Sequence, residues 1–169
     1  MKISRAKLIL NLALSIFLLN ACAGNKTANT NALDVDSKTE VAANDDIEAL
    51  GKIIKLPFAP EETTYSEINL NDENSAANKK KIVAVLKFSV ENANQIVAQA
   101  EKYNPPAPAD VDAENWFPPE LIAKSQETGD EFLKGAAYTA DDFLQPPYVN
   151  GRLTRINDTN YFVLELFSS

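Results

Sequence analysis

The sequence of 169 residues predicts an α+β domain, and three observations support this prediction. Apolar residues recur at every second position in 80–90, which is the period of a β-strand. Residues 90–103 carry apolar side chains at the spacing of one helix face, and residues 151–167 form two strand-like runs around a polar turn. We therefore expect a small antiparallel sheet of about three or four strands with a C-terminal hairpin and one main helix packed on a face.

The first part of the predicted domain, which begins at residue 47, gives weaker signals. Residues 53–58 make a short strand-like apolar run, and the prolines around its end stop it. Residues 63–70 are β-prone but irregular, and residues 71–81 are a polar loop. We expect short strands here.

A strand that leads directly into a helix is the clearest pattern in the chain. The alternation from Ile82 to Phe88 places one set of apolar side chains toward a core, while two valines between them make the other face partly apolar. Ser89 is positioned to cap the N-terminus of the following helix. Asn104 and the prolines after it end that helix.

The remaining elements are punctuated by proline and glycine. Residues 104–119 hold five of the nine prolines and predict a stiff, extended connector. Pro119 suits the first position of a short helix over 118–128, and Gly129 suits the position after its end. One helical turn is expected at 139–142, before the strands 151–156 and 161–167 of the hairpin.

Composition excludes several classes of function. The chain has no histidine and one cysteine, which excludes Ser-His-Asp triads, histidine-ligated zinc, CxxC redox pairs and an internal disulfide. Its formal charge of −8 argues against nucleic-acid binding. No glycine-rich phosphate loop is present. We expect no bound cofactor.

The N-terminus carries a targeting signal. Lys2, Arg5 and Lys7 precede an apolar run over residues 8–19 that is too short to span a bilayer comfortably. The segment then ends in Leu-Asn-Ala followed by Cys22. This arrangement resembles the lipobox of bacterial lipoproteins, a resemblance limited to the first 22 residues.

The resemblance implies that residues 1–21 are a signal peptide and that Cys22 carries lipid. Ala23, rather than aspartate, resembles the pattern of lipoproteins placed in the outer membrane. Loss of the three basic leader residues takes the formal charge from −8 to −11. The alternative is an ordinary secretory signal, cut near the same place, with Cys22 left as a free thiol.

Residues 22–46 would then be a flexible linker, because they hold no aromatic residue and few large apolar ones. The domain organisation predicted is therefore a signal peptide at 1–21, a lipidated linker at 22–46 and a single globular domain at 47–169. The acidic domain should stand away from anionic lipid, with its lipid as the tether.

The candidate contact residues are aromatic. Trp116 and Phe117 lie in the proline-rich connector, and Tyr148 follows a second proline pair. Aromatic side chains on stiff loops make good partner-binding anchors, because little entropy is lost when they bind. The alternative interpretation is that Trp116 and Phe117 fold back to cover the second face of the sheet.

One cluster of acids and one single glutamate have mainly structural interpretations. The carboxylates of Asp110, Asp112 and Glu114 alternate as in a calcium loop, but the glycine and the final glutamate of such a loop are missing, so we expect no metal site. Glu165 lies inside an apolar strand run, and we expect Arg152 or Arg155 to pair with it across the hairpin.

These features predict a lipid-anchored, non-enzymatic protein of the cell envelope, whose domain binds a protein or cell-wall partner. Three alternatives stay open at this point. The domain could be an inhibitor or immunity-type module that attracts a basic envelope protein, a hydrolase of wall or glycan that uses two carboxyl groups, or a structural lipoprotein without a specific ligand.

Overall fold

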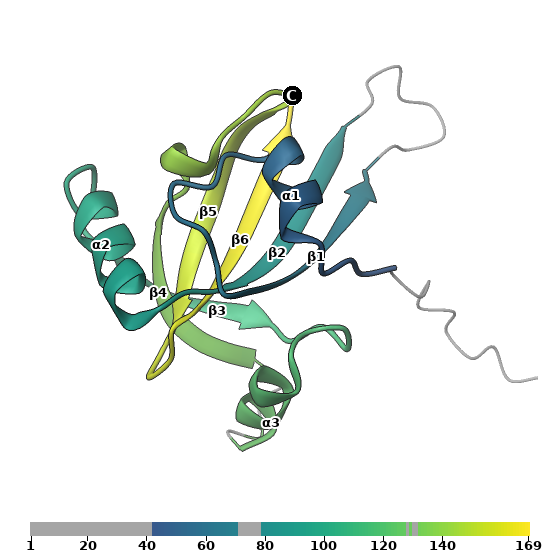
Figure 1. The fold of residues 1–169 in the computed structure, drawn as a ribbon. Coiled ribbons are helices and arrows are strands. Elements are labelled where there is room, and N and C mark those ends of the chain that lie inside the picture. The colour runs from purple at the N-terminus through teal and green to yellow at the C-terminus, as the bar shows by residue number, and fades with distance from the viewer. Residues whose placement is uncertain (1–41, 71–78, 128, 130–131) are drawn as a thin grey trace, which may run out of the picture. The chain divides into compact units, whose positions relative to one another are not determined.

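The computed structural model describes residues 42–70, 79–127, 129 and 132–169, and these form an α+β fold around one antiparallel sheet. The sheet has six strands in the order β1-β2-β6-β5-β4-β3 (Figure 1). The strands are β1 (Glu62–Asn69), β2 (Lys80–Lys87), β3 (Ala107–Asp112), β4 (Phe132–Thr139), β5 (Tyr148–Ile156) and β6 (Tyr161–Ser168). The helices are α1 (Ile47–Ile53), α2 (Val90–Ala100) and α3 (Pro119–Glu127), with a 3-10 turn η1 (Asp141–Phe143).

The predictions for the signal peptide at 1–21, for Cys22 and for the linker up to residue 41 lie outside the described residues, as does most of the polar loop, at 71–78. Within the part of the chain that is described, no helix has the length and apolar character needed to cross a membrane.

Strand β2 is buried on both faces, as its sequence predicts. Ile82, Ala84 and Leu86 belong to one hydrophobic cluster, whereas Val83 and Val85 belong to a second cluster on the opposite face. Because alternate side chains of a strand point to opposite faces, the sheet separates two cores.

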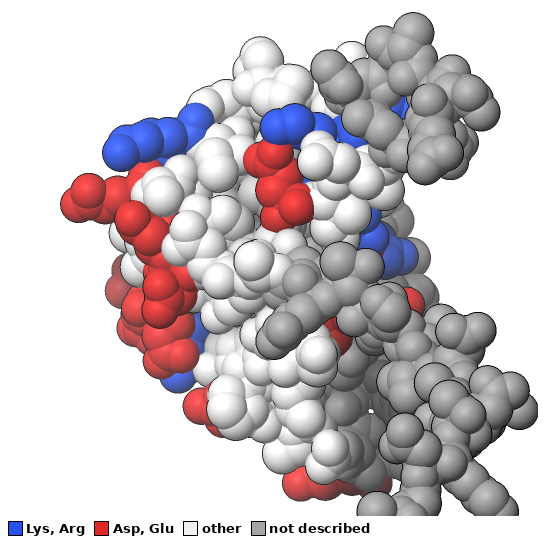
Figure 2. Space-filling view, turned by 90° about the vertical axis from the view of Figure 1, so that its right-hand side faces the viewer, with Lys and Arg blue, Asp and Glu red and all other residues white. Residues whose placement is uncertain are grey.

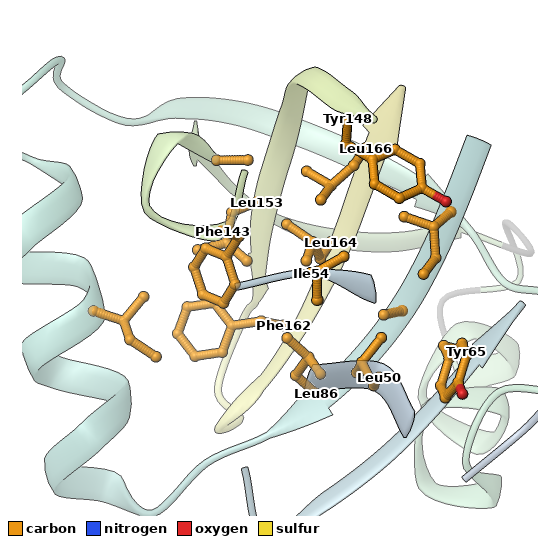
Figure 3. Packing of buried hydrophobic residues seen from close by; sticks show 14 of the residues in the cluster. Leu50, Ile54, Tyr65, Leu86, Phe143, Tyr148, Leu153, Phe162, Leu164 and Leu166 are labelled. Atoms are coloured by element: carbon orange, nitrogen blue, oxygen red, sulfur yellow. The ribbon is translucent and has the colours of Figure 1, made fainter. Parts of the chain in front are cut away.

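The first core lies between the sheet and α1, α2 and η1. Leu50 and Ile54 lie over the sheet residues Leu86 and Leu164 (Figure 3). Phe162 of β6 is fully buried in the same cluster, where its ring meets that of Phe88 edge to face at 5.6 Å between centroids. Such an edge-to-face pair is favourable because the positive ring edge meets the negative ring face.

The second core lies on the opposite face, beneath α3 and the loop before it. Phe117 and Leu121 pack there against Ile156 and Val163 of the hairpin strands. The helix follows the predicted pattern, since Pro119 is its first residue and Gly129 beyond its end has a φ of +71°.

The predicted strand–helix unit and the hairpin are confirmed. The Ser89 side chain accepts a hydrogen bond from the Asn92 amide, as an N-cap does, although α2 ends at Ala100 rather than at 103. In the hairpin turn, Asp158 has a φ of +58°, a left-handed conformation that aspartate tolerates.

The expectation of three or four strands is wrong, because the sheet has six. Residues 107–112, expected to lie within a stiff connector, form β3, which pairs with β4 at the edge of the sheet. An edge strand tolerates Pro108 because half of its backbone groups need no ladder partner. Strand β4 has a weak pattern that the sequence did not reveal.

The strand expected at 53–58 is also wrong, since α1 ends at Ile53 and the residues after it form no strand. Asp46 caps α1 by accepting a hydrogen bond from the Ala49 amide at 3.0 Å. Asn44 forms an isolated bridge with Tyr65 of β1. The last residues of the predicted linker are therefore bonded to the domain.

Candidate functional site

The aromatic residues predicted to bind a partner lie mainly in the interior. Phe117 is 4 % exposed and belongs to the second core, and Trp116 packs partly buried against it, with ring centroids 4.7 Å apart. The alternative interpretation, that this loop folds back to cover the second face of the sheet, is confirmed. The loop offers no freely exposed aromatic pair to a partner.

Tyr148 is 2 % exposed and belongs to the first core. Its hydroxyl donates a hydrogen bond to Glu67 Oε2 at 3.3 Å. Burial, together with the negative charge of Glu67, raises the pKa of the Tyr148 hydroxyl above its usual range. The side chain therefore stays neutral, and it links β5 to β1 rather than contacting a partner.

The predicted pairing of Glu165 is confirmed with Arg152 as the partner. Arg152 lies opposite Glu165 in the β5–β6 register and forms an ion pair with it, and Lys81 of β2 makes a second ion pair at 2.9 Å. Burial disfavours the charged form of Glu165, but the bonds to Lys81 and Arg152 outweigh it and lower the pKa of the carboxyl group. An ionised, doubly paired carboxylate is not a proton donor for hydrolysis.

Arg155, the other partner considered, lies on the opposite face of β5. Its guanidinium contacts Asn94 of α2 at 3.3 Å, the Thr159 carbonyl at 3.3 Å and the ring of Phe162 at 5.8 Å. These contacts join α2 to the hairpin turn.

The residues Asp110, Asp112 and Glu114 line a small cavity of about 90 Å³ beside Lys81 and Arg152. Among the described residues, no group of three side chains is arranged to hold a metal ion. The cavity therefore places acids next to bases, which is an arrangement for mutual charge compensation.

A larger groove of about 480 Å³ lies elsewhere, where the start of β1 meets the N-terminal ends of α1 and α3. Four carboxylates line it, and we call it the acidic groove. The carboxylates belong to Asp45, Glu61, Glu62 and Glu120. The other lining residues are Ile47, Thr63, Thr64, Val85, Pro118, Pro119 and Tyr161.

Three local structures position the acids of the groove. Asp45 is held beside the N-cap of α1, Glu61 lies just before β1, and Glu120 lies in the first turn of α3. An acidic residue in the first turn of a helix is favoured by the helix dipole, which explains the placement of Glu120. The groove thus gathers charges from segments that are distant in the sequence.

One basic residue compensates part of this charge. Lys87 Nζ lies 2.7 Å from Glu62 Oε1, and it lies 5.3 Å from the centroid of the Tyr161 ring. The hydrogen bond to Glu62 keeps the pKa of Lys87 above its usual range, so the lysine is charged. Burial raises the pKa of Tyr161, which therefore lines the groove as a neutral ring and hydroxyl.

The remaining groove carboxylates give the surface a negative character. Asp45, Glu61 and Glu120 are exposed, and the groove lining contains no lysine or arginine among the described residues. Figure 2 shows acidic side chains gathered along one flank of the molecule, with basic side chains next to some of them. Such a surface attracts cationic groups and raises their rate of encounter.

The acidic groove was not found by sequence reasoning. Its acids are separated by up to 75 positions, from 45 to 120, and no short motif joins them. Comparisons of the chain with protein-family models, with curated proteins and with solved structures find no match. The functional argument therefore depends on the chemistry of the groove itself.

Proposed function

We propose that this chain is a lipid-anchored protein of the bacterial cell envelope whose domain binds a basic protein partner in the acidic groove. The anchor is inferred from the charged leader, the apolar run and Cys22. The binding role is inferred from the groove, and its four carboxylates are the observation that carries the proposal.

The size and openness of the groove suit a polypeptide segment. A groove of about 480 Å³ falls in the range of cavities that bind small molecules or a few side chains. Lysine and arginine side chains would bring their ammonium or guanidinium groups to the carboxylates, while their aliphatic stems pack on Ile47, Pro118 and Tyr161.

Net charge supports the same class of partner. The chain without its leader has a formal charge of −11, so long-range attraction favours basic proteins over acidic ones. The same charge repels anionic lipid, which keeps the groove available on the aqueous side of the membrane.

A narrower function within this proposal is inhibition or immunity. A basic wall hydrolase or toxin would be steered toward the groove by opposite charge. Once bound, the hydrolase or toxin could no longer use its basic surface to contact the anionic wall or lipid. The charge of the groove favours this function over that of a structural lipoprotein without a ligand.

The experiment compares two variants that lose the same charge. In the groove variant, Asp45→Asn, Glu61→Gln and Glu120→Gln remove three exposed groove carboxylates that belong to neither hydrophobic core. In the control variant, Glu91→Gln, Glu101→Gln and Glu127→Gln remove three exposed carboxylates outside the groove. Both start from the full chain, solubilised in neutral detergent.

A synthetic lysine-rich nonapeptide is titrated into each protein, and the dissociation constant is measured by fluorescence anisotropy. Three exposed charge pairs of about 0.5 kcal/mol each predict about a tenfold weaker binding to the groove variant. The control variant should bind nearly as well as the unchanged chain. Equal weakening of the two variants would show that net charge, rather than the groove, attracts the peptide.

A further inference from the structure

The acidic groove is built along an open sheet edge. Strand β1 is the first strand in the sheet order, so one side of its backbone faces away from β2. The Leu70 amide donates a hydrogen bond to the Lys79 carbonyl at 2.8 Å, so these two residues are a hydrogen-bonded pair of the antiparallel ladder. Because such pairs occur at every second residue, the backbone N–H and C=O groups of the even-numbered residues of β1 point toward β2. The odd-numbered residues, Thr63, Tyr65 and Glu67, therefore direct their N–H and C=O groups outward.

The bridge at Tyr65 shows that this edge accepts an extended backbone. The Asn44 amide donates to the Tyr65 carbonyl, and the Tyr65 amide donates to the Asn44 carbonyl, both at 2.8 Å. The pairing is antiparallel. The outward groups of β1 are thus oriented for strand addition, with good hydrogen-bond distances.

The chain then leaves the edge before it reaches Thr63. The Asp46 amide donates to Asn44 Oδ1 at 2.9 Å, and the Asp46 side chain caps α1. Within the described residues, Thr63 has no backbone partner on its outward side. The helix start turns the chain away at the position where a seventh strand would continue.

Thr63 is 6 % exposed and is one of the residues that line the acidic groove. Thr63 and Thr64 both line the groove, with Glu61 and Glu62 directly before them. Residues 45–47 form one wall, and residues 118–120 form the other. A segment lying in the groove would therefore run along the outer edge of β1.

We propose that the partner binds as an extended, lysine- or arginine-rich segment that adds to the edge of β1 at Thr63. This inference rests on the proposed function and specifies how the partner is held. The segment accepts a hydrogen bond from the Thr63 amide and donates one to its carbonyl, which is the bonding pattern of β-strand addition. Its alternating side chains point to the two acidic walls of the groove.

An extended occupant fits this edge better than a helical one. A helix satisfies its own backbone groups and would leave the Thr63 amide and carbonyl without a protein partner. The acids also select among extended occupants, because a second copy of this chain would bring its own carboxylates against them. Like charges on an open edge oppose self-association, while a basic segment meets opposite charge.

The experiment uses the full chain in neutral detergent and a nonapeptide of alternating lysine and threonine. Residue-resolved amide hydrogen exchange is measured by NMR with and without saturating peptide. We expect the exchange of the Thr63 amide to slow at least tenfold. The Thr64 amide, which the register turns toward β2, is the internal control and should change little.

Two N-methylated forms of the peptide test the backbone contact directly. One carries methyl groups on the threonine amides and the other on the lysine amides, so the charge is equal. Because alternate amides of a strand point to opposite sides, one methylated form should lose binding at least tenfold, while the other retains it.

The outcomes separate the two proposals. In one outcome, the unmethylated peptide binds the unchanged chain and binds the groove variant more weakly, but the Thr63 amide gains no protection and both methylated peptides bind equally. Strand addition is then wrong, while the proposed function stands. If the unmethylated peptide binds with no loss in the groove variant, both are wrong. An acidic peptide with glutamate in place of lysine should not bind.

Discussion

Glu165 and Arg152 face each other across the β5–β6 hairpin, and Lys81 of β2 approaches the same carboxylate from the neighbouring strand. The Glu165 side chain is 15 % exposed, so one partly buried carboxylate links three strands of the sheet. This arrangement should therefore contribute more to the stability of the fold than an isolated surface ion pair does.

The Glu165→Gln variant should lower the free energy of unfolding by about 1 kcal/mol at pH 7, because it leaves Lys81 and Arg152 without their anionic partner. The pKa of Glu165 is lowered by folding, so its contribution is present above the pKa of an unfolded glutamate, about 4.3, and is lost as the pH falls through the folded value. Urea unfolding at pH 7 and at pH 3 measures both effects. A difference between variant and unchanged chain that does not shrink as the pH is lowered would contradict this account.

Two buried threonines should respond in opposite ways to substitution by valine, which has nearly the same shape. Thr154 is fully buried and its hydroxyl has no hydrogen-bond partner among the described residues, so Thr154→Val should raise the free energy of unfolding by about 1 kcal/mol. The Thr63 hydroxyl donates to the Val85 carbonyl at 3.3 Å, so Thr63→Val should lower it by about 1 kcal/mol. Urea denaturation measures the change in the free energy of unfolding for each variant. A change of the same sign in both variants would contradict the prediction.

Two glycines provide a similar contrast. A Cβ atom at Gly135 would lie 2.3 Å from the Arg155 carbonyl oxygen, so Gly135→Ala must displace backbone and should cost at least about 2 kcal/mol. At Gly51 in α1, the Cβ atom would meet Leu56 Cδ1 at an ordinary 3.6 Å, and alanine should stabilise the helix by about 0.5–1 kcal/mol. Thermal unfolding of the two variants should move the melting temperature in opposite directions.

The proposed lipid anchor has its own test at Cys22. The unchanged chain, expressed in a bacterium, should fractionate with membranes, and its N-terminal peptide should carry diacylglycerol on the cysteine by mass spectrometry. The Cys22→Ser variant should lose the lipid and leave the membrane fraction, because stable attachment needs two or three acyl chains. A bare cysteine in the unchanged chain, or a serine variant that still fractionates with membranes, would remove the anchor from the proposal.

Local patterns made part of the fold predictable. The two-residue period of β2, the Ser89 cap of α2 and the turn around Asp158 each depend on neighbouring residues, and each is confirmed. The pairing of Glu165 with an arginine across the hairpin was also predictable, whereas the choice of Arg152 over Arg155 depends on the register that the structure shows.

The missed elements depend on distant parts of the chain. Strand β3 contains proline and two aspartates, and it is held by pairing with β4, whose own sequence is poor in β-branched residues. The apolar residues of α1 run into an apolar segment at 53–58, so the pattern indicated a strand where a short capped helix packs on the core. The acidic groove is assembled only when β1, α1 and α3 meet.

The most direct test of the central claim is site-specific photo-crosslinking in intact cells of the source organism. A crosslinking amino acid replaces Thr64 inside the groove, or Glu127 near the end of α3 as the control. We predict a specific adduct with a basic envelope protein from position 64 only, and its strong reduction when Asp45→Asn, Glu61→Gln and Glu120→Gln are added. The same adduct from both positions, or one undiminished by these three substitutions, would contradict binding in the acidic groove.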